Sequence, residues 1–161
     1  MAVLTVRRQA GAGAVFVLAV VLAALAGALA STSTAQDYAR LAQPSWAPPS
    51  WVFGPVWSVL YASIALAGWL VWRRAGASAG RWALTAYGVQ LLLNAAWTPI
   101  FFGLRQFGAA FAEILVLWLA IGVTVVLFAR IRRAAAALLL PYWAWTTFAA
   151  ALNYAVWQLN S

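Results

Sequence analysis

Long apolar stretches with almost no charge are the feature of this sequence that most constrains its fold. Five occur, and Glu113 is the only charged residue within them. Each exceeds the ~20 residues that cross a hydrocarbon core of ~30 Å as a helix. Lipid offers backbone groups no other partner, so each stretch must form a helix. The sequence predicts an all-α membrane protein in which residues 1–161 form one five-transmembrane-helix bundle. Its helices are predicted over 10–30, 51–72, 82–104, 107–129 and 134–159.

Composition supports this class and excludes several kinds of site. Hydrophobic residues make up 66% of the chain and charged residues 7%, too few to cover a soluble domain. The absence of His, Cys and Lys excludes disulfides, imidazole or thiolate metal sites and Ser-His-Asp catalysis. Asp37 and Glu113 are predicted at different depths, so a paired-carboxylate mechanism is not expected. We therefore expect no metal site and no conventional catalytic residue.

The ten arginines predict how the chain crosses the membrane. Eight lie before the first helix or in the second and fourth connections, and only Arg40 and Arg105 lie on the other side. By the positive-inside rule, the N-terminus lies in the cytoplasm of a multi-pass protein of the cytoplasmic membrane. The net charge of +8 would also suit a nucleic-acid binder. We favour membrane topology as the explanation of the positive charge, because the arginines fill short gaps between apolar runs and form no continuous basic face.

The first apolar run has a second interpretation. Arg7 and Arg8, the run itself and the sequence 28–30 before Ser31 together resemble a secretory signal with a cleavage site. The run of 21 residues is longer than the ~7–15 expected of a signal core. We expect a retained helix, with cleavage after residue 30 as the alternative.

The connection over 31–50 is expected to be neither helix nor free linker. Pro44, Pro48 and Pro49 restrict its backbone to extended conformations. Such a stiff, aromatic segment could act as a lid on a pocket. The alternative is an interfacial loop anchored by Trp46 and Trp51.

Three helices each present aromatic and amide side chains at helical spacing. Amides in a membrane helix point toward another helix or a ligand, so packing and hydrogen bonding between helices explain each face as well as a site does. The convergence of three such faces favours an apolar pocket for a large planar ligand. The faces are Phe53, Trp57 and Tyr61; Tyr87, Gln90, Asn94, Trp97 and Phe101; and Trp145, Phe148, Ala149, Leu152 and Asn153.

Glu113 is the one acid predicted inside the membrane. An isolated intramembrane acid suggests a functional site. It also lies about one turn inside its helix, near the outward face. A protonated carboxyl group, or an ion pair between Glu113 and Arg105, is the preferred explanation.

Three blocks of residues, in this order along the chain, resemble the translocator protein family, also called tryptophan-rich sensory proteins or peripheral benzodiazepine receptors. The resemblance covers about residues 38–157. The first block is Tyr38, Leu41, Pro44-Ser45-Trp46, Pro48-Pro49, Trp51, Phe53, Trp57 and Leu60-Tyr61. The second and third are Gln90-Leu91, Asn94, Trp97-Thr98-Pro99 and Phe101-Phe102, then Pro141-Tyr142, Trp145, Phe148-Ala149 and Leu152-Asn153.

The resemblance implies a five-helix membrane bundle, commonly a homodimer, that binds porphyrins such as protoporphyrin IX and haem and needs no cofactor. It implies a role in tetrapyrrole sensing, homeostasis or stress response. Light-dependent porphyrin breakdown at Trp57 and Trp145, transport of porphyrin or another amphiphile, and a purely structural bundle are the alternatives. The implied ligand-binding residues are Tyr38, Pro48, Trp57, Tyr61, Asn94, Trp97, Trp145, Phe148 and Ala149.

The chain departs from the family pattern at three places. Gln43 stands where a Lys is usual and Asp37 where a Trp is usual. If that Lys holds porphyrin propionates in the family, either Arg40 replaces it here or porphyrin affinity is lower. The segment 152–158 also lacks the basic residue that ends the sterol-recognition pattern of animal relatives, so sterol binding through it is not expected.

Overall fold

The computed structural model describes the backbone of residues 2–29 and 34–161 and the side chains of residues 10–25 and 36–161. Helices account for nearly all of these ranges, and no strand occurs in them. The elements are α1 (Ala2–Leu29), α2 (Thr34–Arg40), the 3₁₀ turn η1 (Ser50–Val52), α3 (Phe53–Ala79), α4 (Arg81–Thr98), the π-helical turn η2 (Pro99–Gly103), α5 (Phe107–Ile131) and α6 (Arg133–Asn160).

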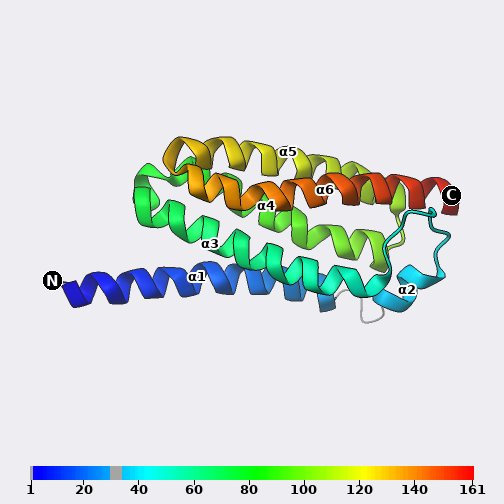
Figure 1. The fold of residues 1–161 in the computed structure, drawn as a ribbon, viewed down its shortest axis with the longest axis horizontal. Coiled ribbons are helices and arrows are strands. Elements are labelled where there is room, and N and C mark those ends of the chain that lie inside the picture. Colours follow the sequence, from blue (N-terminus) through cyan, green and yellow to red (C-terminus); the bar gives the residue numbers. More distant parts are fainter. Residues whose placement is uncertain (1, 30–33) are drawn as a thin grey trace.

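The five long helices lie side by side along one axis (Figure 1). One end of the bundle holds the α3–α4 and α5–α6 turns, and the other holds α2, the α4–α5 connection and the C-terminus. Three helical segments of the described chain are long and apolar enough to cross a membrane: Ser50–Ala79, Phe107–Ile131 and Arg133–Asn160. The all-α prediction is confirmed for the described residues, and each of the five predicted segments contains a long helix.

Two helices differ from the prediction near their ends, where a proline or a glycine changes the backbone conformation. The helix predicted over 82–104 is α-helical only to Thr98, because Pro99 has no N–H to continue the hydrogen-bond ladder. One π turn follows, in which the Leu104 N–H donates to the Pro99 carbonyl over 2.9 Å. In the last turns of α3, Gly76 adopts a φ of 69°, a left-handed conformation that glycine takes without steric cost.

The connection over 31–50 is partly helical, so the prediction of no helix there is wrong. Residues 34–40 form α2, since the prolines begin only at Pro44. Asp37 in its first turn and Arg40 in its last turn match the helix dipole. The proline-bearing remainder, residues 41–49, is non-helical and is called the connecting loop below. The alternative of cleavage after residue 30 falls on residues 30–33, outside the described backbone.

The helix α1 packs against α3 and α4. Its Val20 is buried, and the ring of Phe16 meets the Tyr87 ring edge-on at a centroid distance of 5.7 Å. Gly68 permits this approach, because a Cβ atom there would lie 2.8 Å from Tyr87 Cζ and from Phe16 Cδ1. The first helix is thus an integral wall of the bundle.

Candidate functional site

A cavity of about 420 Å³ lies inside the half of the bundle nearest α2 and the C-terminus. All five long helices contribute to its wall, and none of the lining residues carries a charge. They are Ala24, Tyr38, Ser50, Phe53, Gly54, Trp57, Tyr61, Asn94, Trp97, Thr98, Phe101, Phe102, Ile114, Leu117, Trp145, Thr146, Ala149, Leu152 and Asn153.

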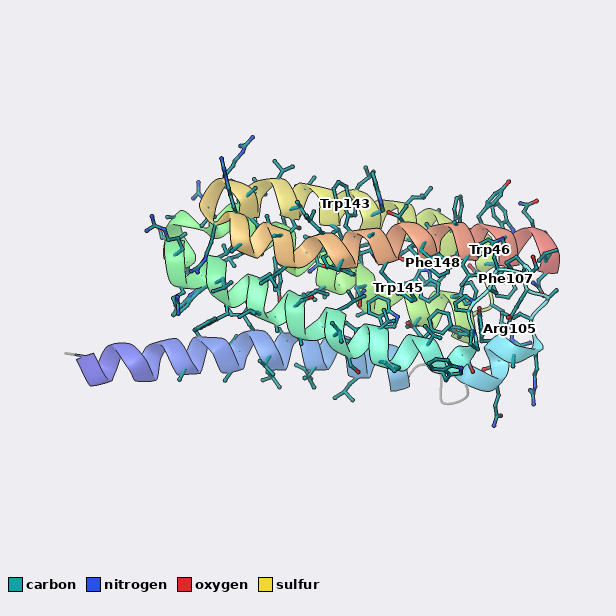
Figure 2. The ribbon with its side chains drawn as sticks, viewed as in Figure 1. Trp46, Arg105, Phe107, Trp143, Trp145 and Phe148 are labelled. Atoms are coloured by element: carbon teal, nitrogen blue, oxygen red, sulfur yellow. The ribbon has the colours of Figure 1, made fainter. Side chains whose placement is uncertain are left out.

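Indole rings from three helices form the flat parts of this wall. Trp57 of α3 lies 5.1 Å from the Tyr61 ring, measured between centroids. Trp97 of α4 stacks on Phe101 at 4.8 Å. Trp145 of α6 meets the edge of Phe53 at 5.9 Å, which joins α6 to α3 across the cavity. Figure 2 shows Trp145 on the side of α6 that faces α3.

A chain of buried hydrogen bonds links three helices beside the cavity. The Tyr61 hydroxyl donates to Asn94 Oδ1 over 3.2 Å, and Asn94 Nδ2 donates to the Tyr142 hydroxyl over 3.1 Å. The Tyr142 hydroxyl in turn donates to Gln90 Oε1 over 3.0 Å. Hydrogen bonding between helices, the alternative left open for this face, therefore accounts for the Gln90 carbonyl oxygen, whereas its buried Nε2 has no partner in the described structure. Asn94 has two roles. Its hydrogen bonds join α3 to α6, and its side chain also lines the cavity.

A second amide holds the Trp97 ring in place. Trp97 Nε1 donates to Asn153 Oδ1 over 3.1 Å, and Asn153 Nδ2 donates to the Phe107 carbonyl over 2.9 Å. Trp145 differs, because its Nε1 is buried and has no hydrogen-bond partner in the described structure. A buried N–H without a partner is costly. Trp145 also lines the cavity, so this N–H is available to an acceptor placed there.

Two further deep tryptophans lie away from the cavity, between α5 and α6. Trp118 Nε1 donates to Thr147 Oγ1 over 2.8 Å, and Trp143 Nε1 donates to the Trp118 carbonyl over 3.1 Å. Figure 2 shows Trp143 on the α5 side of α6, opposite Trp145. Like Trp97, both indoles have a hydrogen-bond partner for their N–H group, as buried indoles usually do.

The connecting loop is fastened across the end of the bundle that contains the cavity. Asn160 of α6 holds Ala42 by two hydrogen bonds, of 3.0 Å to its N–H and 2.9 Å to its carbonyl. The Tyr38 hydroxyl donates to the Pro48 carbonyl over 3.1 Å. Burial raises the pKa of Tyr38, so this hydroxyl keeps its proton at neutral pH. Trp46 of the loop meets Phe148 in an edge-to-face contact at a centroid distance of 5.8 Å. None of residues 41–49 lines the cavity, so a lid role for the loop stays a prediction.

The structure brings seven of the nine predicted site residues to the cavity wall. The two exceptions are Pro48, which accepts the Tyr38 hydrogen bond, and Phe148, whose ring packs on Trp145 at 5.3 Å. Residues that the sequence did not single out include Ala24, Ile114 and Leu117. Ile114 and Leu117 share a face of α5 at a spacing of three, a pattern that core packing produces equally well.

The predicted ion pair between Glu113 and Arg105 is not formed. Arg105 pairs instead with Asp37, at 3.6 Å between Nη2 and Oδ1. Both carboxyl oxygens of Glu113 are buried, without a hydrogen-bond partner in the described part of the chain. Glu113 is also absent from the cavity wall, so the protonated-acid explanation stays a prediction.

Comparison with known proteins agrees with the architecture. Residues 14–158 match the TspO/MBR family. The human translocator protein is 45% identical over 125 residues, which cover 76% of this chain and 74% of the relative. The CrtK protein of Rhodobacter capsulatus is 37% identical over 151 residues, 91% of each chain. The tryptophan-rich sensory protein of Cereibacter sphaeroides is 37% identical over 123 residues, 76% of each chain. This chain is therefore a membrane protein that belongs to the TspO/MBR family.

Proposed function

We propose that this protein binds tetrapyrroles, with protoporphyrin IX as the type ligand, and acts in tetrapyrrole sensing or homeostasis. One observation carries the proposal. Indole rings from α3, α4 and α6 converge on a single uncharged cavity of about 420 Å³. A cavity of this size falls within the ~300–1,000 Å³ typical of small-molecule sites. Flat aromatic walls suit a planar macrocycle, which they hold by stacking.

The polar groups of the site match the two parts of such a ligand. The macrocycle meets Tyr61, Asn94 and Trp145, whose hydroxyl, amide and unpartnered indole N–H are among the hydrogen-bonding groups of the wall. The propionates find no charged group there. They stay at the loop end of the bundle, where Arg40 and Arg105 are exposed. Arg105 is two-thirds exposed despite its pairing with Asp37, so it remains accessible to a second carboxylate.

We also propose that all five long helices cross the membrane with the N-terminus in the cytoplasm. Six arginines lie in the α5–α6 turn or in the last or first turns of α3, α4, α5 and α6 at one end of the bundle, and Arg40 and Arg105 belong to the other end. The positive-inside rule places the six-arginine end in the cytoplasm. The cavity and the connecting loop then lie at the outer side. The six are Arg73, Arg74, Arg81, Arg130, Arg132 and Arg133.

The proposed topology predicts the behaviour of reporter fusions in a bacterial host. Alkaline phosphatase fused after Ser161 is expected to be active, because the enzyme needs the oxidising outer side. Green fluorescent protein fused at the same place is expected to stay dark when exported by the general secretion route. The reverse pattern would show an inverted protein, and activity of both reporters would show mixed insertion. Either result contradicts the proposed orientation.

Titration of the purified protein with protoporphyrin IX tests the binding proposal. Saturable binding is expected, followed by the porphyrin absorption band, with a rise in melting temperature. At a hundred times Kd, a ligand of the native state adds about 2.7 kcal/mol of stability. Haem is expected to bind no more tightly, since the chain has no His or Cys for axial ligation. The proposal fails if binding does not saturate, and much tighter haem binding would contradict a site that recognises the macrocycle alone.

A further inference from the structure

A second apolar space lies on the outside of the bundle, between α1 and α3. This lateral groove has a volume of about 520 Å³ and shares only Tyr61 with the cavity. Val17, Val21 and Leu66 on its walls are each about half exposed, so the groove opens to the surroundings. Its lining residues are Gly13, Val17, Val20, Val21, Ser58, Tyr61, Ala62, Ala65, Leu66 and Trp69.

The groove is narrow because small residues line its length and a large aromatic ring lies near each end. The small residues are Gly13, Ala62 and Ala65, whose side chains leave the middle of the groove open. At one end the Trp69 ring lies against Gly13, where a Cβ atom would be 3.4 Å from Trp69 Nε1. Near the other end the Tyr61 hydroxyl is turned inward to Asn94, which leaves the ring for the groove. The result is a narrow apolar channel that suits a single hydrocarbon chain.

The length of the groove matches one leaflet of a bilayer. Ser58 and Trp69 are eleven residues apart, which corresponds to about 16 Å along a helix. The hydrocarbon core of a bilayer is ~30 Å thick, so one leaflet contributes ~15 Å. One acyl chain that enters at the Trp69 end would therefore pass Tyr61 and reach Ser58 near the middle of the membrane.

Two arginine side chains lie at the Trp69 end of the groove. The Arg73 guanidinium lies 4.7 Å from the centre of the Trp69 ring, and Arg74 is exposed beside it in sequence. The chain has only two carboxylate side chains. Asp37 pairs with Arg105 at the opposite end, and Glu113 has no partner in the described structure. The counter-charge for the arginines at this end must come from outside the chain, and anionic headgroups of a membrane leaflet supply it.

We propose that the lateral groove binds one acyl chain of an anionic phospholipid from the leaflet at the arginine-rich end, with the lipid phosphate at Arg73 and Arg74. The apolar channel selects the chain, and the arginines select the charge of the headgroup. This site is separate from the cavity and does not depend on porphyrin binding. Tyr61 is the wall common to both.

Native mass spectrometry of the delipidated full-length protein tests the proposal. Dioleoyl phosphatidylglycerol and dioleoyl phosphatidylcholine are titrated separately, and the first bound lipid is quantified. The anionic lipid is expected to bind roughly fivefold more tightly, as one arginine near the headgroup provides. Arg73→Gln is expected to remove this preference, because it weakens phosphatidylglycerol binding more than binding of phosphatidylcholine, whose choline cation already offsets the phosphate charge. Ala62→Phe fills the groove from an exposed position and is expected to remove the first site for both lipids.

Matched variants separate this site from general contact with lipid. Arg130→Gln makes the same charge change on α5 at the same end of the bundle, and Ala144→Phe adds the same ring at an exposed position of α6. Both are expected to behave as the wild type, and unchanged melting temperatures verify folding. Equal affinity of the wild type for the two lipids overturns the proposal. So does an equal loss in Arg130→Gln or Ala144→Phe, or loss of a dimer rather than of lipid in Ala62→Phe.

Discussion

Replacing Trp57 and Trp145 together with alanine is expected to weaken protoporphyrin IX binding by roughly a thousandfold, because buried aromatic anchors each contribute about 2 kcal/mol. Both rings line the cavity, from α3 and from α6. Their loss removes two stacking surfaces and widens the space between these helices. Titration by porphyrin absorbance measures the effect without relying on tryptophan fluorescence, which the substitutions themselves change.

Trp118→Ala is the matched control for this double substitution. Trp118 has the same ring, but it packs on Trp143 between α5 and α6 and is not part of the cavity wall. Its removal is expected to leave porphyrin affinity unchanged within about twofold, since no contact with the ligand is lost. An equal loss of affinity in Trp118→Ala would show that the bundle as a whole, and not the cavity, responds to the missing ring.

Trp145→Phe separates the ring of Trp145 from its N–H. Trp145 Nε1 has no partner in the described structure, so losing this N–H breaks no hydrogen bond within the protein. Stability without ligand is therefore expected to hold, and any loss of porphyrin affinity reports a hydrogen bond from this indole to the ligand. Porphyrin affinity that remains at the wild-type value in both Trp145→Phe and the double alanine variant would contradict the proposed site.

The inward face of α4 could be predicted from the sequence because two constraints act on it together. An uncharged stretch of this length in lipid must be helical, and its amides must point away from lipid. Gln90 and Asn94 therefore orient the helix, and the spacing places Tyr87 and Phe101 on the same face. All four are buried, with exposures of 7% or less. Here the chemistry of two amides determined which way the whole helix faces.

How far the cavity extends along that face of the helix could not be predicted from the sequence. Tyr87 and Gln90 share the face with Asn94 and Trp97 but lie outside the cavity. Tyr87 is packed between Phe16 of α1 and Phe128 of α5, with centroid distances of 5.7 and 5.8 Å. Residues from other helices thus decide where the cavity ends. Helical periodicity carries no information about such neighbours.

The ion pair of Arg105 shows a second limit of reasoning from sequence. Glu113 is close to Arg105 along the chain, whereas Asp37 is distant and lies in α2. Arg105 precedes α5 and adopts a φ of 53°, so its side chain does not follow the register of that helix. The structure places it against Asp37 instead. A short helix before the prolines, which the sequence did not predict, supplies this partner.

Asn94→Leu is expected to destabilise the protein and to weaken porphyrin binding at the same time. Asn94 accepts from Tyr61 and donates to Tyr142, so leucine removes two hydrogen bonds that join α3 to α4 and α4 to α6. Hydrogen bonds between membrane helices average about 0.6 kcal/mol and reach about 1.7, which gives an expected loss of about 1–3 kcal/mol for the pair. Reversible unfolding in mixed micelles measures this loss.

A double-mutant cycle with Tyr142→Phe assigns part of that loss to one bond. Tyr142 is fully buried, so its hydroxyl has no access to water that could replace Asn94. We expect the double variant to be less destabilised than the sum of the single variants, by about 0.6–1.7 kcal/mol. Strict additivity would mean that the two side chains do not interact. Affinity is expected to fall in Asn94→Leu more than in Tyr142→Phe, since Asn94 lines the cavity and Tyr142 does not. The reverse order would place the polar recognition of the ligand deeper in the bundle, at the Tyr142–Gln90 pair.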